Sequence, residues 1–537
     1  MDEAELRRGS RSATALLSSL CGVAIAIALA AGVTSLSAAS PVIRIESGLV
    51  QGTQTGEAIV YRSIPYASPP TGELRWKAPQ PPPSWTGVRQ TGVFGPVCMQ
   101  TGVSVPGAAP EPASEDCLTL NVWTPADARA KLPVMVWIPG GGFTQESASM
   151  PLYWGDALTR RGVIVVTINY RVGVFGFLAH PELSRESRFG TSGNYGLLDQ
   201  IAALEWVKRN IGAFGGDAGR VTIWGQSAGA MAVTMLTTSP LSKGLMHRAI
   251  GQSGGFFTPP EATLQPDTWF LRGAEAVGQT YMSAAGATSI GELRTRPAEA
   301  LLKTGGGTRH PIIDGYVLPQ KQYDVFMSGR QHDVPTLVGF NAEEARSMLG
   351  NRSFKVDTFA DDVATAFGSP LFRDLANDYL RLHRPSTDDE ARQVRVALER
   401  DLRFGWEVWT WARLQARTGR KNAFLYYFTL APAASPGALW SAGGAGHWAE
   451  LRYVFDHLEP GARDADRKMA SSMAAYWTNF AKSGNPNGGS LPRWRPVSAN
   501  GDTALVLGER IEMGALPALQ DVRLIDGLYA RLRSAAR

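Results

Sequence analysis

Two serines of this chain lie in the pattern Gly-x-Ser-x-Gly, Ser227 in GQSAG and Ser253 in GQSGG. The pattern is typical of a serine on a sharp strand-to-helix turn, where the exposed hydroxyl acts as a nucleophile. A serine hydroxyl is weak at neutral pH, so it requires a histidine to take its proton and a carboxylate to orient that histidine. The chemistry indicated is acyl transfer, for which one serine is enough.

The residues around each serine favour Ser227. The stretch VTIW (221–224) before it reads as a strand, and AGAMAVTMLTTS (228–239) after it reads as an unbroken helix. Ser253 is followed by GGFFTPPE, and Pro259 and Pro260 prevent a long helix from beginning at that serine. We therefore predict that Ser227 is the nucleophile and that Ser253 lies at the end of the next strand.

The histidine is less clearly marked by local sequence. In hydrolases built on this turn the chain order is serine, acid, histidine, so the histidine should follow residue 227. His447 lies in SAGGAGHWAELRYVF, where a glycine-rich loop before a helix can place an imidazole over strand ends. His310 and His332 are alternatives by position alone.

A triple glycine indicates where negative charge would be stabilised. WIPGGGF (137–143) places three glycines directly after a buried strand. Their backbone N–H groups can point at one oxygen because no side chain intervenes. Together with the N–H of Ala228 they would form an oxyanion hole; a plain turn is the alternative.

The elements that must position these residues follow an α/β pattern. Short apolar stretches at 132–138, 162–170, 220–224, 247–252 and 334–340 read as strands, and 196–214 has helical spacing. Continuous apolar strands with helical crossovers predict a large, mostly parallel central sheet with helices on both faces. Residues 265–310 and 350–420 read as additional helices that form a cap or wall.

Residues 1–39 are predicted to be a secretory signal peptide. Arginines at 7, 8 and 11 precede an apolar run, and Ser37 and Ala39 supply the small residues of a cleavage site. An uncleaved membrane anchor is the alternative. Residues 40–537 are predicted to form a single domain, secreted or periplasmic, with no stable membrane partner after the signal is removed.

Composition and cysteine count restrict the remaining classes. A net charge of +5 is small for 537 residues and there is no basic stripe, so nucleic acid is not expected as a partner. No His-Glu-x-x-His or Cys-x-x-Cys spacing occurs, so neither a metal nor another cofactor is expected. Without Cys21 in the leader, Cys98 and Cys117 remain, and an even number in an exported chain favours a disulfide. Two separate thiols are the alternative.

The chain resembles the type B carboxylesterase family, the carboxylesterase and cholinesterase group of α/β-hydrolases, and looks like a secreted member of bacterial type. The similar stretches follow one another in order across nearly the whole mature chain: YRSIPYASPPTGELRWKAP (61–79), SEDCLTLNVWTP (114–125), PVMVWIPGGGF (133–143), NYRVGVFGFL (169–178), GNYGLLDQIAALEWVKRNIGAFGGDAGRVTIWGQSAGA (193–230), VGFNAEEA (338–345), GHWAELRYVF (446–455) and YWTNFAKSGNPN (476–487).

This resemblance implies an α/β-hydrolase fold with helical cap insertions, and it implies roles for single residues. The catalytic residues would be Ser227 as nucleophile, Glu344 as acid and His447 as base. The oxyanion donors would be Gly141, Gly142 and Ala228. The structural residues would be a Cys98–Cys117 disulfide and the ion pairs Arg75–Glu115 and Arg171–Asp199.

Several positions depart from the family pattern. Pro139 precedes the triple glycine where histidine or tyrosine is common, and Gln226 replaces a glutamate beside the nucleophile. Ala345 replaces a glycine, and Glu343 replaces an aspartate and so offers a second carboxylate next to Glu344. Since side chains alternate in direction, only one of the two can reach His447, and the motif register favours Glu344.

The expected function is hydrolysis of carboxylic esters of small molecules through an acyl-enzyme, with neutral or non-choline esters preferred. One alternative is an esterase specialised for one bulky ester, such as a toxin, an aromatic acid ester or an antibiotic ester. A more distant alternative is a binding protein on the same fold, which would lack the catalytic set. Trp440 and Trp448 flank His447 in sequence and either line the site or pack in the core.

Overall fold

The structure is a computed structural model that describes residues 41–102, 111–128, 131–258, 262–264, 272–366, 373–432 and 444–535. All of these residues belong to one unit, Ser40–Arg537. The predicted signal peptide at 1–39 lies outside the described residues, as does Trp440. Within the described ranges no helix combines the length and apolar character needed to cross a bilayer.

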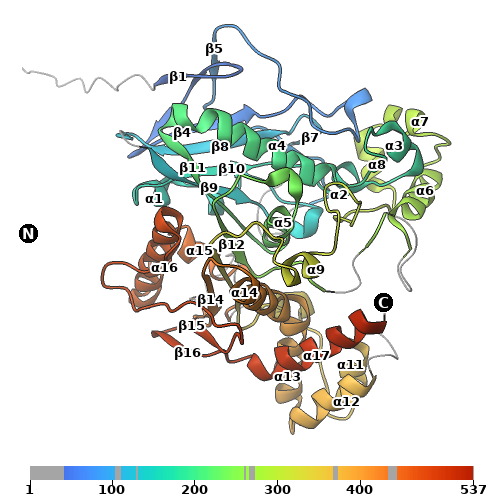
Figure 1. Ribbon diagram of the computed structural model, residues 1–537, viewed down its shortest axis with the longest axis vertical. Helices are drawn as coiled ribbons and strands as arrows, with labels where there is room; N and C mark the ends of the chain where they lie inside the picture. Colours follow the sequence, from blue (N-terminus) through green and yellow to red (C-terminus); the bar gives the residue numbers. More distant parts are fainter. Residues whose placement is uncertain are drawn as a thin grey trace, which may run out of the picture. The chain divides into compact units, whose positions relative to one another are not determined.

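An eleven-stranded sheet runs through the unit (Figure 1). In spatial order its strands are β16 (Ile511–Ala515), β15 (Thr503–Leu507), β14 (Ala423–Phe428), β13 (Thr336–Asn341), β12 (Arg248–Gln252), β11 (Gly216–Gln226), β9 (Leu132–Ile138), β10 (Ile164–Ile168), β8 (Thr119–Pro125), β4 (Ala58–Pro65) and β3 (Thr53–Thr55). The smaller sheets contain β1 (Val42–Ile45), β2 (Gly48–Gln51) and β5 (Val88–Gln90), and β6 (Val97–Cys98) with β7 (Ala113–Ser114).

The centre of the large sheet is parallel. Every neighbouring pair from β10 to β15 runs parallel, whereas β16, β8, β4 and β3 join antiparallel at the two edges. The predicted strand at 132–138 matches β9, and the other predicted strands differ from β10, β11, β12 and β13 only at their ends. The predicted mostly parallel sheet is therefore confirmed, with antiparallel edges that the sequence analysis did not resolve.

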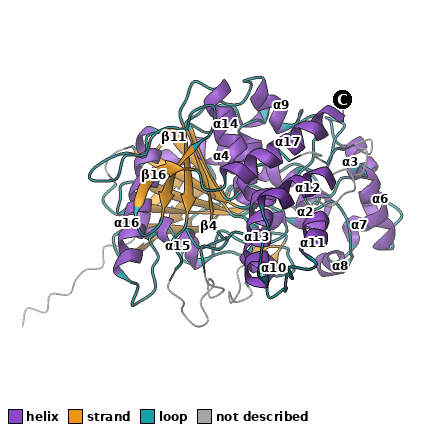
Figure 2. Cartoon of the chain, turned by 90° about the horizontal axis from the view of Figure 1, so that it is seen from below, coloured by secondary structure: helices purple, strands orange, loops and turns teal. Residues whose placement is uncertain are grey.

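Helices cover both faces of this sheet (Figure 2). Along β9, Val134, Val136 and Ile138 share a core with residues of α4 (Tyr195–Asn210), α5 (Ala228–Leu236) and α14 (Trp406–Thr418). Met135 and Trp137 point to the other face, where they share a core with α15 (Leu451–Val454) and α16 (Asp464–Ser483). This alternation buries the strands on both sides, which explains why they read as continuous apolar stretches.

Further helices lie beyond the two layers. The sequence analysis predicted those within 265–310 and 350–420, although α14 in the second range covers the sheet itself, and it did not predict the helix at 519–535. One group contains α6 (Ala274–Ala284), α7 (Ile290–Thr295) and α8 (Ala298–Lys303). The other contains α11 (Phe359–Ala366), α12 (Arg373–Leu382), α13 (Asp388–Arg400) and α17 (Leu519–Ala535), and in Figure 1 it lies at the opposite end of the unit from α6–α8. The shorter helices are α1 (Asp156–Thr159), α2 (Gly173–Phe177), α3 (Pro181–Glu186), α9 (Gln322–Met327) and α10 (Arg346–Leu349).

The structural pairs implied by the family resemblance are present. Cys98 and Cys117 form a disulfide with a Cα–Cα distance of 5.0 Å. Arg171 and Asp199 form a buried ion pair of 2.7 Å. The Nε of Arg75 donates to Glu115 at 2.7 Å. These contacts join residues that are 19, 28 and 40 positions apart in the chain.

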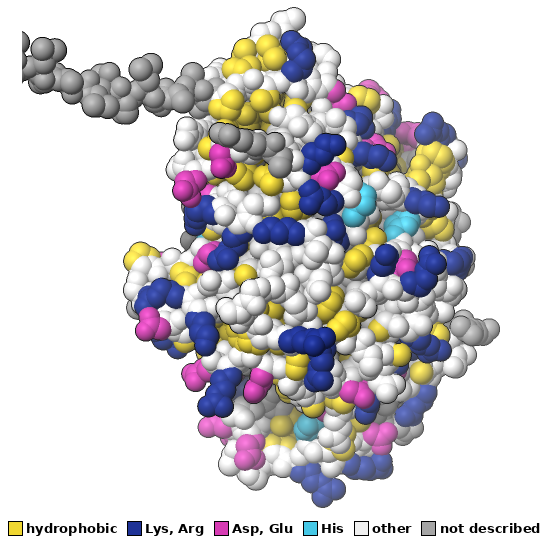
Figure 3. All heavy atoms as spheres, turned by 60° about the vertical axis from the view of Figure 1, so that its left-hand side comes forward, with side chains coloured by type: hydrophobic (Ala, Val, Ile, Leu, Met, Phe, Trp, Pro, Cys, Tyr) yellow, Lys and Arg dark blue, Asp and Glu magenta, His cyan; other side chains and the backbone are white. Residues whose placement is uncertain are grey.

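Charged side chains of both signs lie on the face of the molecule drawn in Figure 3. On the face drawn in Figure 3, Lys and Arg side chains lie among acidic and apolar ones. The net charge of +5 is therefore not gathered into one stripe on that face.

Candidate active site

Ser227 occupies the sharp turn between β11 and α5. The strand ends at Gln226, the helix begins at Ala228, and Ser227 between them has φ 56° and ψ −125°. A non-glycine residue with positive φ is sterically strained, so the surrounding structure must hold it there. The Ser227 N–H donates to the Gln252 carbonyl of the neighbouring strand at 2.8 Å, which is one such restraint. The side chain is half-buried at the carboxyl end of the sheet.

The two glycines of the GQSAG motif are required by close backbone contacts. A Cβ on Gly229 would lie 2.1 Å from the Ile138 carbonyl oxygen at the end of β9. A Cβ on Gly225 would lie 2.6 Å from the Gly229 carbonyl carbon. Both distances are shorter than real Cβ contacts, so the turn can pack against β9 only with glycine at these positions.

Ser253 has a different environment. It follows β12 directly, is fully buried, and its N–H donates to the Gly339 carbonyl at 2.8 Å. No helix begins within residues 254–258. The prediction that Ser253 lies at a strand end is confirmed. The GQSGG segment also packs against the Ser227 turn. A Cβ on Gly254 would lie 2.5 Å from the Ser227 carbonyl oxygen, so only glycine fits there.

Glu344 and His447 form a buried hydrogen bond of 2.5 Å between Oε2 and Nδ1. Glu344 lies in the turn after β13, and His447 lies in the loop after β14. The second carboxylate oxygen of Glu344 accepts the Asn341 N–H at 2.7 Å. The acid and the histidine thus meet at the same end of the sheet as Ser227.

The rival side chains point elsewhere. Glu343 is partly exposed and pairs with Arg346 at 2.9 Å, as expected from alternating side-chain directions. The Nε2 of His332 lies 2.7 Å from the Ser239 carbonyl oxygen, and His310 lies beside Phe143. In the part of the chain that the structure describes, neither of these two histidines pairs with a carboxylate.

Phe404 contacts the His447 imidazole and was missed by sequence reasoning. Its ring centroid lies 4.5 Å from that of His447 with an interplanar angle of 30°. It belongs to a π-helical turn, Asp401–Gly405, between α13 and α14. The preceding Arg400 pairs with Asp401 and donates to the Ala342 carbonyl at 3.1 Å. These contacts fix the π-turn against the loop that carries Glu344.

Gln226 contributes a second contact to the histidine. Its buried Nε2 donates to the His447 carbonyl oxygen at 2.6 Å. The sequence analysis noted this residue only as a departure from the family pattern. The structure shows that the amide also restrains the backbone of the loop that carries the imidazole.

The triple glycine lies against the serine turn. A Cβ on Gly140 would lie 2.7 Å from the Gln226 carbonyl oxygen and 3.3 Å from the Ser227 Cβ. Gly141 and Gly142 have φ of 76° and 61°, which favours glycine.

Glu146 supports this loop from within. Its Oε2 accepts the Gly140 N–H at 3.2 Å and the Tyr153 hydroxyl at 2.8 Å. The N–H of Gly140 is thus bonded to Glu146 and is not one of the proposed oxyanion donors.

Comparison with known proteins agrees with this geometry. The model of the carboxylesterase family matches residues 39–524. The chain belongs to the carboxylesterase family. It is 37% identical to a fumonisin B1 esterase of Sphingopyxis macrogoltabida over 87% of this chain and 86% of that protein. It is 32% identical to a para-nitrobenzyl esterase of Bacillus subtilis (strain 168), with 83% of this chain and 90% of that protein covered.

A solved structure and a further sequence relative show the same relationship. A PNB esterase structure superimposes with a TM-score of 0.76 at 30% identity, covering 90% of this chain and 99% of that one. Liver carboxylesterase 1 of Oryctolagus cuniculus is 32% identical over 88% of this chain and 91% of that protein. The carboxylesterase described here therefore has the α/β-hydrolase fold and is a carboxylic ester hydrolase.

A second buried carboxyl of this carboxylesterase, Glu450, lies near Glu344. Its oxygens accept the Asn341 Nδ2–H at 2.5 Å and the Gln252 Nε2–H at 3.0 Å. Burial and the nearby Glu344 carboxylate raise the pKa of Glu450 to about 7. Asn341 donates to both glutamates, so it joins the two carboxyls in one network.

We expect Glu450→Gln to alter the pH dependence of stability. A carboxyl whose pKa is about 7 when folded and about 4.5 when unfolded binds more protons in the fold, so its presence lowers stability as pH rises between those values. The variant removes this loss. Its free energy of unfolding relative to the wild type should rise from pH 4.5 to about pH 7, by on the order of 3 kcal/mol, and then stay level.

Urea unfolding at several pH values measures this difference. Glu459→Gln, the same change at an exposed carboxyl, is the matched control and should show no such rise. A difference between Glu450→Gln and the wild type that stays constant from pH 4.5 to pH 8 would contradict the raised pKa.

Proposed function

We propose that Ser227, His447 and Glu344 hydrolyse carboxylic esters through an acyl-enzyme. The Ser227 oxygen attacks the ester carbonyl carbon while His447 takes the serine proton and then gives it to the departing alcohol. A water molecule then attacks the acyl carbon while His447 takes a proton from the water. The bond between the acyl carbon and the Ser227 oxygen breaks, His447 returns the proton to that oxygen, and the carboxylic acid leaves. The buried Glu344–His447 hydrogen bond at the strand ends beside the Ser227 turn is the observation that carries this proposal.

The tautomer of His447 follows from its hydrogen bond. With Nδ1–H donating to the Glu344 carboxylate, Nε2 is left as the base that accepts the serine proton. Glu344 also stabilises the imidazolium formed in each step. The ring is restrained by Phe404 and its backbone by Gln226, so the base is held in place before substrate binds.

The negative oxygen of the tetrahedral intermediate is assigned to Gly141, Gly142 and Ala228. The first two lie in the loop packed against the Ser227 turn, and Ala228 is the first residue of α5. Backbone N–H groups at a helix start favour negative charge, and such donors stabilise a transition state by about 3 kcal/mol each. No cofactor is required for these steps.

The proposed substrates are small-molecule esters without a cationic alcohol. The loop between Cys98 and Cys117, MQTGVSVPGAAPEPASED (99–116), contains no aromatic residue that could hold a quaternary ammonium. Gln226 is neutral where a glutamate would add negative potential. Glu111 accepts a hydrogen bond from the Ser147 hydroxyl at 2.6 Å, so it already bonds within the protein.

A narrower candidate is specialisation for one bulky ester. It is favoured by the relative of 37% identity, whose name gives fumonisin B1 as its ester. This candidate uses the same catalytic groups and differs only in the acyl and alcohol sizes that the site accepts.

We also propose that the protein is exported to the periplasm or secreted. The arginines and apolar run of residues 1–39 support cleavage of a signal peptide after Ala39. The Cys98–Cys117 disulfide supports an oxidising compartment. The partner is then a small ester, with no nucleic acid and no stable membrane association.

Ser227→Ala should lower kcat/KM for a simple neutral ester by about 10⁴-fold or more, because it removes the nucleophile. Ser253→Ala is the matched control. It removes a buried hydroxyl that has no hydrogen-bond partner in the described structure, so activity should stay within about twofold and stability should not fall. Peptide mapping after organophosphate labelling provides a second measurement, and a label on the peptide that carries Ser253 would refute the assignment.

Glu344→Gln should lower kcat by about 10⁴-fold, since the amide no longer stabilises the correct tautomer and the imidazolium. Glu343→Gln should change kcat by less than about threefold, because that carboxylate is partly exposed and pairs with Arg346. Steady-state kinetics of the two purified variants test this ranking. The reverse order would move the acid to Glu343.

Neutral esters should be preferred over choline esters of the same acyl group. The comparison is kcat/KM for butyrylcholine against the neutral isostere 3,3-dimethylbutyl butyrate. A charge at 4 Å is worth roughly 4 kcal/mol at an effective dielectric of about 20, so losing both the aromatic wall and the glutamate should be measurable. A ratio well above one for the choline ester would show that another group binds the cation.

A further inference from the structure

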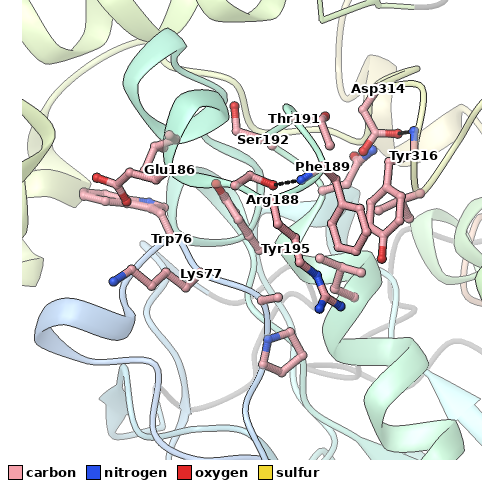
Figure 4. Close-up of a pocket in the computed structure, with 18 of the residues that line it drawn as sticks. Trp76, Lys77, Glu186, Arg188, Phe189, Thr191, Ser192, Tyr195, Asp314 and Tyr316 are labelled. Carbon is pink, nitrogen blue, oxygen red and sulfur yellow. Dashed lines mark hydrogen bonds between the residues drawn. The ribbon is translucent and has the colours of Figure 1, made fainter.

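One cavity, of about 510 Å³, is drawn in Figure 4. In its wall Phe189 stacks on Tyr316, and Glu186 accepts two hydrogen bonds from Arg294, so these groups already have partners within the protein. A second cavity, of about 90 Å³, is lined by side chains that include Gln100 and Glu146. Since this space leaves one side of Glu146 without close packing, hydrogen bonds must hold that residue in place.

The backbone of Glu146 is strained. Its φ is 87°, in a region where a residue with a Cβ is sterically unfavourable, and the residue is buried. Such a conformation persists only where the surrounding structure holds it, and strained residues gather at functional sites. A glutamate at this position therefore indicates that its side chain has a role near the triple-glycine loop.

The side chain of Gln100 holds this backbone from both sides. Its Oε1 accepts the Glu146 N–H at 2.7 Å, and its Nε2 donates to the Glu146 carbonyl oxygen at 3.1 Å. The same Nε2 donates to the Cys98 carbonyl oxygen at 3.1 Å, and Cys98 is joined to Cys117 by the disulfide. One amide thus fixes the strained φ of Glu146 and ties it to the disulfide loop.

The side chain of Glu146 lies against the triple-glycine loop. Its Oε2 accepts the Gly140 N–H at 3.2 Å and the Tyr153 hydroxyl at 2.8 Å. A Cβ on Gly141 would lie 3.0 Å from the Glu146 Cγ and 3.1 Å from the Glu146 Cβ, so the Gly141 backbone packs directly on this side chain. A hydrogen bond at Gly140 and a contact at Gly141 together restrain the peptide groups that follow.

We propose that Glu146, held by Gln100 of the disulfide loop, is a positioning residue for the oxyanion hole. It contacts no substrate atom; it keeps the N–H groups of Gly141 and Gly142 directed at the place where the oxyanion forms. Donors fixed in advance are effective because they need no reorganisation when the charge develops. This inference rests on the proposed function, which assigns the oxyanion to these glycines. Loss of Glu146 should therefore weaken binding of a tetrahedral adduct more than binding of the ester.

The test measures kcat and KM for 4-nitrophenyl butyrate and the inhibition constants of 1,1,1-trifluoro-2-octanone and 2-octanone. The Ser227 oxygen adds to the carbonyl carbon of the trifluoro ketone and its proton passes to His447, so this adduct carries the oxyanion, whereas 2-octanone only occupies the site. Glu146→Gly removes the side chain and supplies a residue that favours positive φ. It should lower kcat and the affinity for the trifluoro ketone by about 30-fold each, and change KM and the affinity for 2-octanone by less than about threefold.

Two further variants separate positioning from a general loss of structure. Gln100→Ala should weaken the trifluoro ketone by about tenfold, because it releases the backbone of Glu146. Glu146→Gln should stay within about fivefold of the wild type, because its amide oxygen can accept both hydrogen bonds. Gln80→Ala is the matched control: the exposed Gln80 donates to the Ala78 carbonyl oxygen at 3.0 Å, again two residues earlier, and its loss should leave the affinity for the trifluoro ketone unchanged.

Inhibition constants do not depend on the fraction of enzyme that is folded, so misfolding cannot imitate these shifts. Wild-type affinity for the trifluoro ketone in both Glu146→Gly and Gln100→Ala would overturn the positioning role and leave the proposed function standing. Equal binding of the two ketones by the wild-type enzyme would overturn the oxyanion assignment and this inference with it.

Discussion

The close packing of three strand ends around Ser227 is the constraint on which the rest of the site depends. The Ile138 carbonyl oxygen at the end of β9 occupies the position that a Gly229 side chain would need. On the other side, the Ser227 carbonyl oxygen lies where a Gly254 side chain would be. Because the backbone approaches this closely, Ser227 is held at a φ that it would otherwise avoid. The same packing brings the triple-glycine loop after β9 against the serine.

The two similar motifs are restricted by different contacts. In GQSAG the glycines allow the turn to form against β9. In GQSGG, Gly251 makes room for the Trp411 ring, and only Gly254 passes close to the Ser227 carbonyl oxygen. The two strands are parallel neighbours with Gly225 opposite Gly251, but only Ser227 is followed by a helix.

Features encoded in contiguous residues could be predicted from the sequence, and features that depend on distant contacts could not. The strand, turn and helix around Ser227 follow from local periodicity and from the prolines after Ser253. The Glu344–His447 pair spans 103 residues, and only the resemblance to a family selected it. Phe404, Arg400 and Glu450 were missed because their importance arises from packing between segments that no local pattern connects. In the sequence, these residues are visible only as an aromatic and two charged side chains within stretches that read as ordinary helix.

The packing at the strand ends also determines which charged groups are buried near the His447 imidazole. In the proposed mechanism Glu344 accepts the hydrogen bond of the His447 Nδ1–H as a carboxylate, while Glu450 shares Asn341 with it and has its pKa raised to about 7. A glutamate in place of Gln226 would introduce a further carboxylate and would lose the amide that donates to the His447 carbonyl. Two neighbouring buried carboxylates repel each other, so each would be less stable as an anion than a single carboxylate would be. The neutral glutamine therefore both restrains the histidine loop and limits the negative charge beside it, which leaves Glu344 to act on the imidazole.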